Sequence, residues 1–145
     1  MIIAPSSRNS GFARAEAKVE KSSSEAATGT LSVRLWASSS ARDTDFTVKL
    51  IDVHPPNVDY PDGFAQNVSD TILRARYRNS RERAEPLEPG KVYELDIVLY
   101  PTSNVFAKGH RIRLDVSSSN FPRFDINPNT GGPLGKDRRF LIVEN

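Results

Sequence analysis

Apolar and polar side chains alternate along several short segments of the chain. This period of two is typical of a β-strand with one buried face. The segments that show it most clearly are 31–37, 46–50, 93–99 and 110–118. Ile51 and Val53 continue the second segment out of phase, which indicates a β-bulge or a stretch covered on both faces. Short strands without a convincing helical period beyond residue 30 predict an all-β sandwich, most simply a jelly roll.

The connections between these strands differ in length and in chemistry. Residues 59–70 are rich in turn-forming residues and are predicted to be a long loop. Residues 72–78 alternate again, and this predicts a strand whose arginines at 74, 76 and 78 form its wet face. The stretch 120–136 is irregular and dense in Pro and Gly, and a short apolar run follows at 140–143. Loops of this length usually serve function or an interface.

The first 29 residues have a different composition from the rest of the chain. They are rich in Ser, Ala, Glu and Lys and hold few large apolar residues. Alanines at 13, 15 and 17 favour helix, whereas Ser22–Ser24 and Gly29 would end it. We therefore expect residues 1–29 to be a poorly structured or partly helical arm and residues 30–145 to be the folded domain.

Charge and composition exclude several classes of function. The net charge is only +2 and the arginines between 74 and 83 are interrupted by Glu82, so a solvated face is favoured over a nucleic-acid-binding stripe. There is no cysteine, which excludes thiol chemistry and favours a reducing compartment. The apolar opening ends at Pro5, too early for a signal peptide or a membrane span. A cytoplasmic protein without membrane or nucleic-acid partners is the expectation.

No catalytic or metal-binding set is apparent in the sequence. The Gly-x-Ser-x-Gly turn that exposes the nucleophile of α/β-hydrolases does not occur. His54 and His110 each stand at a predicted strand end without a sequence partner, and no His or Cys cluster has zinc-ligand spacing. Asp43 and Asp45 could join a calcium site, but Asx-turn hydrogen bonds at a strand entrance explain them more simply. We therefore predict no catalytic residue, metal ion or cofactor.

A few aromatic residues are candidates for a contact surface. Trp36, the only tryptophan, falls on the polar side of its strand, where it could cover a neighbouring domain, stack on a sugar or lie under a second layer. Phe121 and Phe124 lie around a proline in the long loop, and they either form an interface or pin the loop to its own core. The candidate contact residues for an interdomain or ligand surface are Trp36, Phe46, Asn120, Phe121, Pro122 and Phe124.

Four segments, in order, resemble one known family. They are LSVRLWASSSARDTDFTVKLIDV (31–53), YPDGFAQNVSDTILRARY (60–77), EPGKVYELDIVLYPTSNVFAKGHRIRLD (88–115) and VSSSNFPRFDINPNTG (116–131). All four are similar to the C-terminal domain of the cocaine-esterase and X-Pro dipeptidyl-peptidase serine hydrolases, and the SSSNFPRF and NPNTG strings are specific. The resemblance implies a jelly-roll-like, galactose-binding-domain-like β-sandwich that packs beside an α/β-hydrolase domain, helps to shape the substrate cleft and supplies none of the catalytic triad.

Two departures from the family pattern affect what the resemblance implies. Family members enter this domain through an apolar strand where this chain has its Ser-rich arm, and they continue past residue 145 into a closing strand. The chain therefore resembles a truncated accessory domain, inactive by itself, whose partner is an α/β-hydrolase domain in the same or a separate chain. An unpaired strand edge predicts self-association. The alternatives are a stand-alone carbohydrate-binding jelly roll, because such folds present aromatic platforms, and a decayed gene fragment without activity.

Overall fold

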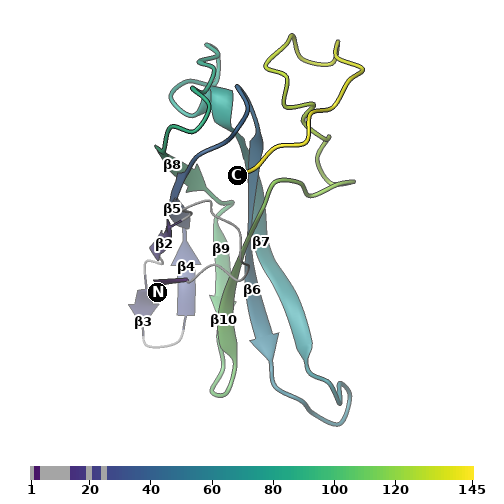
Figure 1. The fold of residues 1–145 in the computed structure, drawn as a ribbon. Coiled ribbons are helices and arrows are strands. Elements are labelled where there is room, and N and C mark those ends of the chain that lie inside the picture. Colours follow the sequence, from purple (N-terminus) through teal and green to yellow (C-terminus); the bar gives the residue numbers. More distant parts are fainter. Residues whose placement is uncertain (1, 4–13, 19–20, 24–25) are drawn as a thin grey trace.

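The strands pack as an all-β sandwich (Figure 1). The computed structural model describes residues 2–3, 14–18, 21–23 and 26–145. Its strands are β1 (Ile2–Ile3), β2 (Arg14–Lys18), β3 (Lys21–Ser23), β4 (Ala26–Gly29), β5 (Ser32–Ala37), β6 (Asp45–His54), β7 (Phe64–Arg74), β8 (Tyr93–Val98), β9 (Thr102–Val105) and β10 (Arg111–Ser117). A short 3-10 helix, η1 (Ala75–Tyr77), follows β7.

The core lies between two antiparallel sheets. One has the order β1-β2-β5-β8 and the other has the order β10-β6-β7, while β3-β4-β9 form a smaller third sheet. Buried side chains of the facing strands form one cluster that includes Val33 and Leu35 of β5, Val48 of β6 and Leu95 of β8. The strands predicted at β5, β6, β8 and β10 are confirmed, and burial follows the period of two in β5 and β8. In β10 only Leu114 is buried, and Val116 is exposed.

Strand β6 explains why Ile51 and Val53 are apolar out of phase. It lies between β7 and β10 and is buried on both faces over much of its length. The register with β7 also shifts at Leu50 and Ile51, whose partners are Ser69 and Asn67. Burial on both faces therefore explains Ile51 and Val53, whereas the extra residue of the irregularity is Val68 on the partner strand, because the pairing of β6 with β10 is regular.

Two predictions between residues 59 and 78 were wrong. Strand β7 begins at Phe64, so the loop is shorter than expected, and the strand ends at Arg74, where η1 begins. The arginines do not form a wet face, because Arg76 is only 7% exposed and makes an ion pair with a fully buried carboxylate. Alternation could not reveal this, since a basic residue at every second position is equally compatible with solvent and with buried counter-ions.

The N-terminal arm contributes strands where the structure describes it. Strand β2 pairs with β5 in register from Arg14 to Lys18, and β4 pairs with β9. The expected helix around Ala15 and Ala17 is therefore wrong, because cross-strand pairing overrides the weak helix propensity of alanine. The expectation for residues 1, 4–13, 19–20 and 24–25 lies outside the described residues. Strand β9 itself was not predicted.

Candidate docking surface

The chain after β10 forms a long segment that contains neither strand nor helix. This segment, residues 118–145, is called the C-terminal loop below. It runs as a yellow-green trace beside one end of the sandwich (Figure 1). Without a backbone ladder, such a loop needs side-chain contacts to stay in place.

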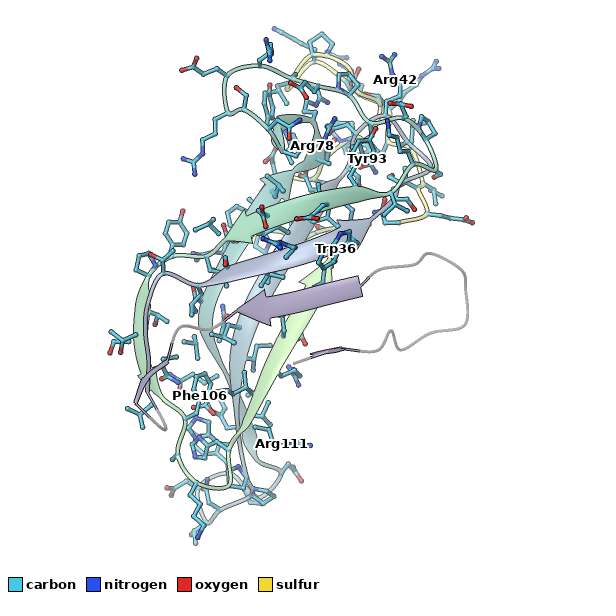
Figure 2. The ribbon with its side chains drawn as sticks, turned by 90° about the vertical axis from the view of Figure 1, so that its left-hand side faces the viewer. Trp36, Arg42, Arg78, Tyr93, Phe106 and Arg111 are labelled. Carbon is cyan, nitrogen blue, oxygen red and sulfur yellow. The ribbon has the colours of Figure 1, made fainter. Side chains whose placement is uncertain are left out.

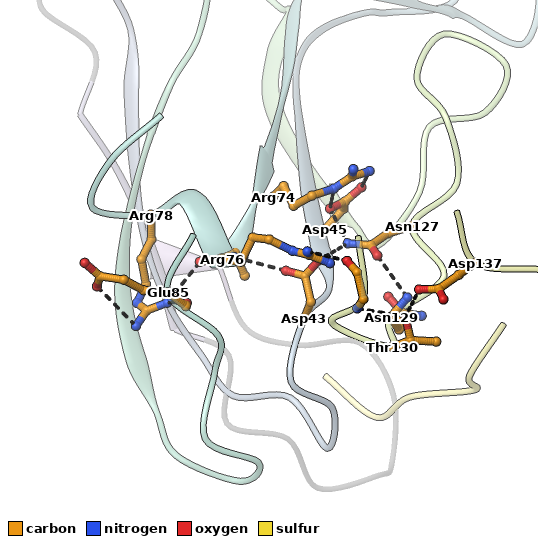
Figure 3. A network of polar contacts seen from close by, with 12 residues as sticks. Asp43, Asp45, Arg74, Arg76, Arg78, Glu85, Asn127, Asn129, Thr130 and Asp137 are labelled. Carbon is orange, nitrogen blue, oxygen red and sulfur yellow. Dashed lines mark hydrogen bonds and ion pairs between the residues drawn. The ribbon is translucent and has the colours of Figure 1, made fainter. Parts of the chain in front are cut away.

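A buried polar network holds the C-terminal loop to the sandwich (Figure 3). At its centre, the carboxylate of Asp43 is fully buried and accepts a 2.7 Å hydrogen bond from Nε of Arg76. Nη1 of Arg76 donates to the carbonyl of Gly132 in the loop at 2.7 Å. The amide of Asn127 donates to Asp43 at 2.9 Å and to Asp45 at 2.7 Å. One loop asparagine therefore binds both aspartates of the Asp-x-Asp turn.

Arg74 extends the same network from the end of β7. Its guanidinium makes two hydrogen bonds to the carboxylate of Asp45, at 2.9 and 3.0 Å, and a longer contact of 3.4 Å to Asp125 of the loop. The hydrogen bond to Asp45 is the main cause that raises the pKa of Arg74, and burial acts in the opposite direction. Arg74 therefore stays charged and keeps Asp45 paired.

These contacts replace the roles expected for Asp43 and Asp45. Both do stand at the entrance of β6, but their buried carboxylates accept hydrogen bonds from arginines and from Asn127 rather than from the neighbouring backbone of an Asx turn. The arginines supply the positive charge that a calcium ion would have supplied. The Asp-x-Asp turn is visible in the sequence, but the hydrogen-bond partners of Asp43, Arg76 and Asn127, lie 33 and 84 residues away along the chain.

Further contacts fix the two ends of the C-terminal loop. Near its start, Asn120 and Arg123 both bind Asp70 of β7, at 3.1 and 3.0 Å. Near its end, the backbone of Glu144 exchanges hydrogen bonds with Ser40 at 2.9 and 3.0 Å. The loop is thus anchored at its start, middle and end.

The anchored loop exposes a set of large apolar side chains. Phe121 is 67% exposed and Ile142 is completely exposed. The exposed apolar residues of the loop are Phe121, Ile126, Leu134, Phe140, Leu141 and Ile142. Scattered exposed apolar residues are ordinary, but six within residues 118–145 make this segment a candidate for a contact surface. We call this set the apolar loop surface.

The structure separates the contact residues predicted from the sequence. Phe121 and Pro122 are exposed on the C-terminal loop, and the side chain of Asn120 anchors the loop through its hydrogen bond to Asp70. Phe124 is half-buried, with the Arg123 guanidinium 5.6 Å from its ring centre. These residues are adjacent in the chain and remain candidates for an interdomain contact.

The two remaining candidates lie elsewhere in the sandwich. Trp36 is half-buried on β5, where its backbone pairs with Arg14 of β2 and Glu94 of β8 (Figure 2). Phe46 belongs to the core and is 5% exposed, so its side chain does not form part of an exposed contact surface. Tyr60, which could have joined a sugar platform, stacks on Phe64 near the β6–β7 turn, at the end of the sheet away from the C-terminal loop (Figure 1). The aromatic residues thus do not share one platform.

Fold and surface together define a class: a β-sandwich with an anchored C-terminal loop that carries six exposed large apolar side chains. A family model described as the X-Pro dipeptidyl-peptidase C-terminal non-catalytic domain matches residues 24–141. The chain belongs to this family.

Known relatives carry the matched region as a small part of a longer chain. The cocaine esterase of Rhodococcus sp. (strain MB1 Bresler) is 50% identical over 111 residues, which are 77% of this chain and 18% of the esterase. The crystal structure of an aminopeptidase from the marine sediment archaeon Thaumarchaeota archaeon matches with a TM-score of 0.69 at 40% identity, over 81% of this chain and 20% of that one. An α-amino acid ester hydrolase matches with a TM-score of 0.73 at 31% identity, over 90% and 22%.

The chain therefore spans about a fifth of the length of these relatives. The matched family is non-catalytic, in agreement with the absence of a nucleophile turn in the sequence. Among the described residues, no helix is long and apolar enough to cross a membrane.

Proposed function

We propose that this domain serves a serine hydrolase of the cocaine-esterase and X-Pro dipeptidyl-peptidase type by docking on its α/β-hydrolase portion through the apolar loop surface. The domain then contributes shape and stability to the enzyme, and the catalytic groups come from the other portion. The observation that carries the proposal is a set of exposed large apolar side chains on a loop that buried hydrogen bonds from Arg76 and Asn127 hold to the sandwich.

Anchoring matters because a mobile loop would lose conformational entropy on docking. Immobilising each side chain at an interface costs about 0.5–1.5 kcal/mol, and this cost falls when the segment is held in advance. The network of Asp43, Asp45 and Asn127 provides that order in the free domain. The apolar side chains can then gain about 25 cal/mol for each Å² that they bury.

The proposed occupant follows from the comparisons and from the chemistry of the surface. The relatives contain about four fifths of a chain beyond the matched region, and that remainder is the hydrolase body. The exposed loop residues are aromatic and aliphatic, as in the centre of a stable interface, and the charged residues at the centre of the anchoring network, Asp43, Asp45 and Arg76, are buried.

A binding experiment with matched variants tests the proposal. The probe is the Rhodococcus cocaine esterase from which the segment matching this chain has been removed, and this chain is added in trans. We expect saturable binding and a gain of esterase thermal stability. Both should weaken about tenfold or more in Phe121→Ala and Ile142→Ser, as hot-spot truncation costs above 1 kcal/mol.

Two control substitutions match these variants in size and exposure. Tyr100→Ala removes an aromatic ring that is 63% exposed, and Val58→Ser alters a β-branched side chain that is 97% exposed. Both lie outside the C-terminal loop and should leave binding unchanged. Absence of saturable binding by the folded chain, or equal loss in controls and loop variants, would refute the proposal.

We further propose that the isolated domain does not hydrolyse esters or Xaa-Pro amides. The support is the family match and the lack of a nucleophile turn. Turnover of p-nitrophenyl esters by the pure chain that a serine-directed inhibitor abolishes would refute this.

We also propose that the free chain self-associates when no hydrolase portion covers it. Strands β7 and β10 are the edges of their sheet, and the apolar loop surface is open beside them. Sedimentation at high concentration should show dimers or larger species that Ile142→Ser reduces. A clean monomer at every concentration would contradict the expectation.

A further inference from the structure

The chain holds only two histidines, and the fold brings them together at the end of the β10-β6-β7 sheet. His54 ends β6, and His110 directly precedes β10. Their ring centres are 4.1 Å apart. The carboxylate of Asp52, two residues before His54 on β6, contacts both rings. This cluster is not visible in the sequence, because Asp52 and His110 are 58 residues apart.

The carboxylate of Asp52 is buried without a strong cation. It is 2% exposed. Its partners among the described residues are Nδ1 of His110 at 2.9 Å, Nε2 of His54 at 3.6 Å and the side-chain amide of Asn104 at 3.4 Å. The other buried aspartates, Asp43, Asp45 and Asp70, each pair with an arginine. Asp52 therefore differs in having imidazoles where the others have a permanent positive charge.

We propose that Asp52, His54 and His110 bind a divalent zinc ion that ties the end of β6 to the start of β10. One ring nitrogen of each histidine and one carboxylate oxygen of Asp52 lie within 4.8 Å of one another. Ligands at about 2.0–2.2 Å from a tetrahedral ion stand about 3.3 Å apart. Oδ1 of Asp52 is 2.9 Å from Nδ1 of His110, and Oδ2 of Asp52 is 3.6 Å from Nε2 of His54, so the two separations, each to a different oxygen, lie on either side of that value. Two imidazoles and one carboxylate are a donor set that suits zinc rather than calcium or magnesium.

The surroundings hold the ligands in place and shield the site. Phe64 packs edge-on against the His54 ring at 5.7 Å, and Tyr60 stacks on Phe64 at 5.0 Å. Oε1 of Gln66 lies 3.2 Å from Nε2 of His54, so this amide oxygen is placed to serve as a fourth ligand in competition with water. Such outer contacts orient ligands and raise metal affinity.

The two turns at this end of the sheet are also well defined. Asn57 accepts hydrogen bonds from the backbone of Asp59 and Tyr60, both at 2.9 Å, and this folds the loop after His54. On the other side, His110 donates its backbone N–H to Ala107 at 3.0 Å, across a turn in which Gly109 has φ +90°. The three ligand side chains thus lie on strand residues and turns whose backbone is held by hydrogen bonds.

The test is a zinc titration of the full chain after treatment with a chelator. Calorimetry should show one site, and nitrogen NMR of the imidazoles should show metal ligation at Nε2 of His54 and Nδ1 of His110. The assignment is unambiguous because there are no other histidines. Calcium and magnesium should move neither signal. Zinc that leaves both imidazole signals unchanged would overturn the proposal, and this reading needs no variant.

Substitutions of single residues provide a second and independent test of the zinc site. His54→Gln should lower zinc affinity about tenfold or more and abolish the rise in melting temperature that zinc causes. Asp62→Asn, an exposed carboxylate on the same loop, is the matched control and should bind zinc like the original chain. Equal affinity in His54→Gln and the original chain would overturn the proposal.

Discussion

The buried pair of Asp43 and Arg76 offers the sharpest test of how the C-terminal loop is held. Asp43→Asn keeps the shape of the side chain but removes its charge. Arg76, which is 7% exposed, then stays buried without a counter-ion. Both carboxylate oxygens of Asp43 accept hydrogen bonds, one from the backbone N–H of Arg76 and the other from Nε of Arg76 and the Asn127 amide, so the NH2 group of the new amide faces a donor in either orientation.

The expected cost is large in relation to the stability of a domain. Breaking a buried ion pair by removing one partner costs about 3–5 kcal/mol, because it leaves an uncompensated charge. A domain of this size is stable by about 5–15 kcal/mol, so the variant should lose a substantial fraction. With a urea dependence of about 2 kcal/mol per molar, the unfolding midpoint should fall by about 1.5–2.5 M.

Urea unfolding followed by fluorescence of Trp36, the only tryptophan, measures this shift. Asp96→Asn is the control, since Asp96 and Arg34 form an exposed pair at 3.2 Å, and such pairs contribute about 0–1 kcal/mol. Asp43→Asn combined with Arg76→Met should cost less than the sum of the two single changes. A midpoint for Asp43→Asn equal to that of the control would refute the reasoning.

Three further predictions test separate parts of the structure. Asn127→Ala should free the C-terminal loop, so its amides exchange hydrogen faster while those of β5 and β8 stay protected. Gly63→Ala should lower the melting temperature more than Gly90→Ala. Both glycines have positive φ, but only a Cβ at Gly63 would meet a backbone carbonyl oxygen, at 2.8 Å. Equal falls in melting temperature would contradict this. The hydrogen bond from Asn79 lowers the pKa of Glu85, so Asn79→Ala should raise that pKa in a carboxyl NMR titration. An unchanged pKa of Glu85 in this variant would contradict the contact. In the original chain, the stability that this carboxylate contributes is present above its ordinary pKa and is lost as pH falls through the lowered value.

The sequence was sufficient for the main strands of the sandwich. Alternation in β5, β8 and β10 arises because one face of a strand meets the core and the other meets solvent, and this is a local property of the chain. The family was also visible in strings such as SSSNFPRF. Alternation wrongly predicted that the arginines of β7 and η1 face solvent. An arginine contributes the same polar position to the pattern whether it contacts water or pairs with a buried aspartate.

What the sequence alone determined is therefore the class of fold, the positions of its central strands and the lack of a nucleophile turn. Only the tertiary structure decided that Asn127 joins two aspartates more than 80 residues away and that His110 meets Asp52 across 58 residues. Such contacts depend on how strands pair and where a loop returns. Local patterns cannot encode them, because the partners become neighbours only when the whole chain has folded.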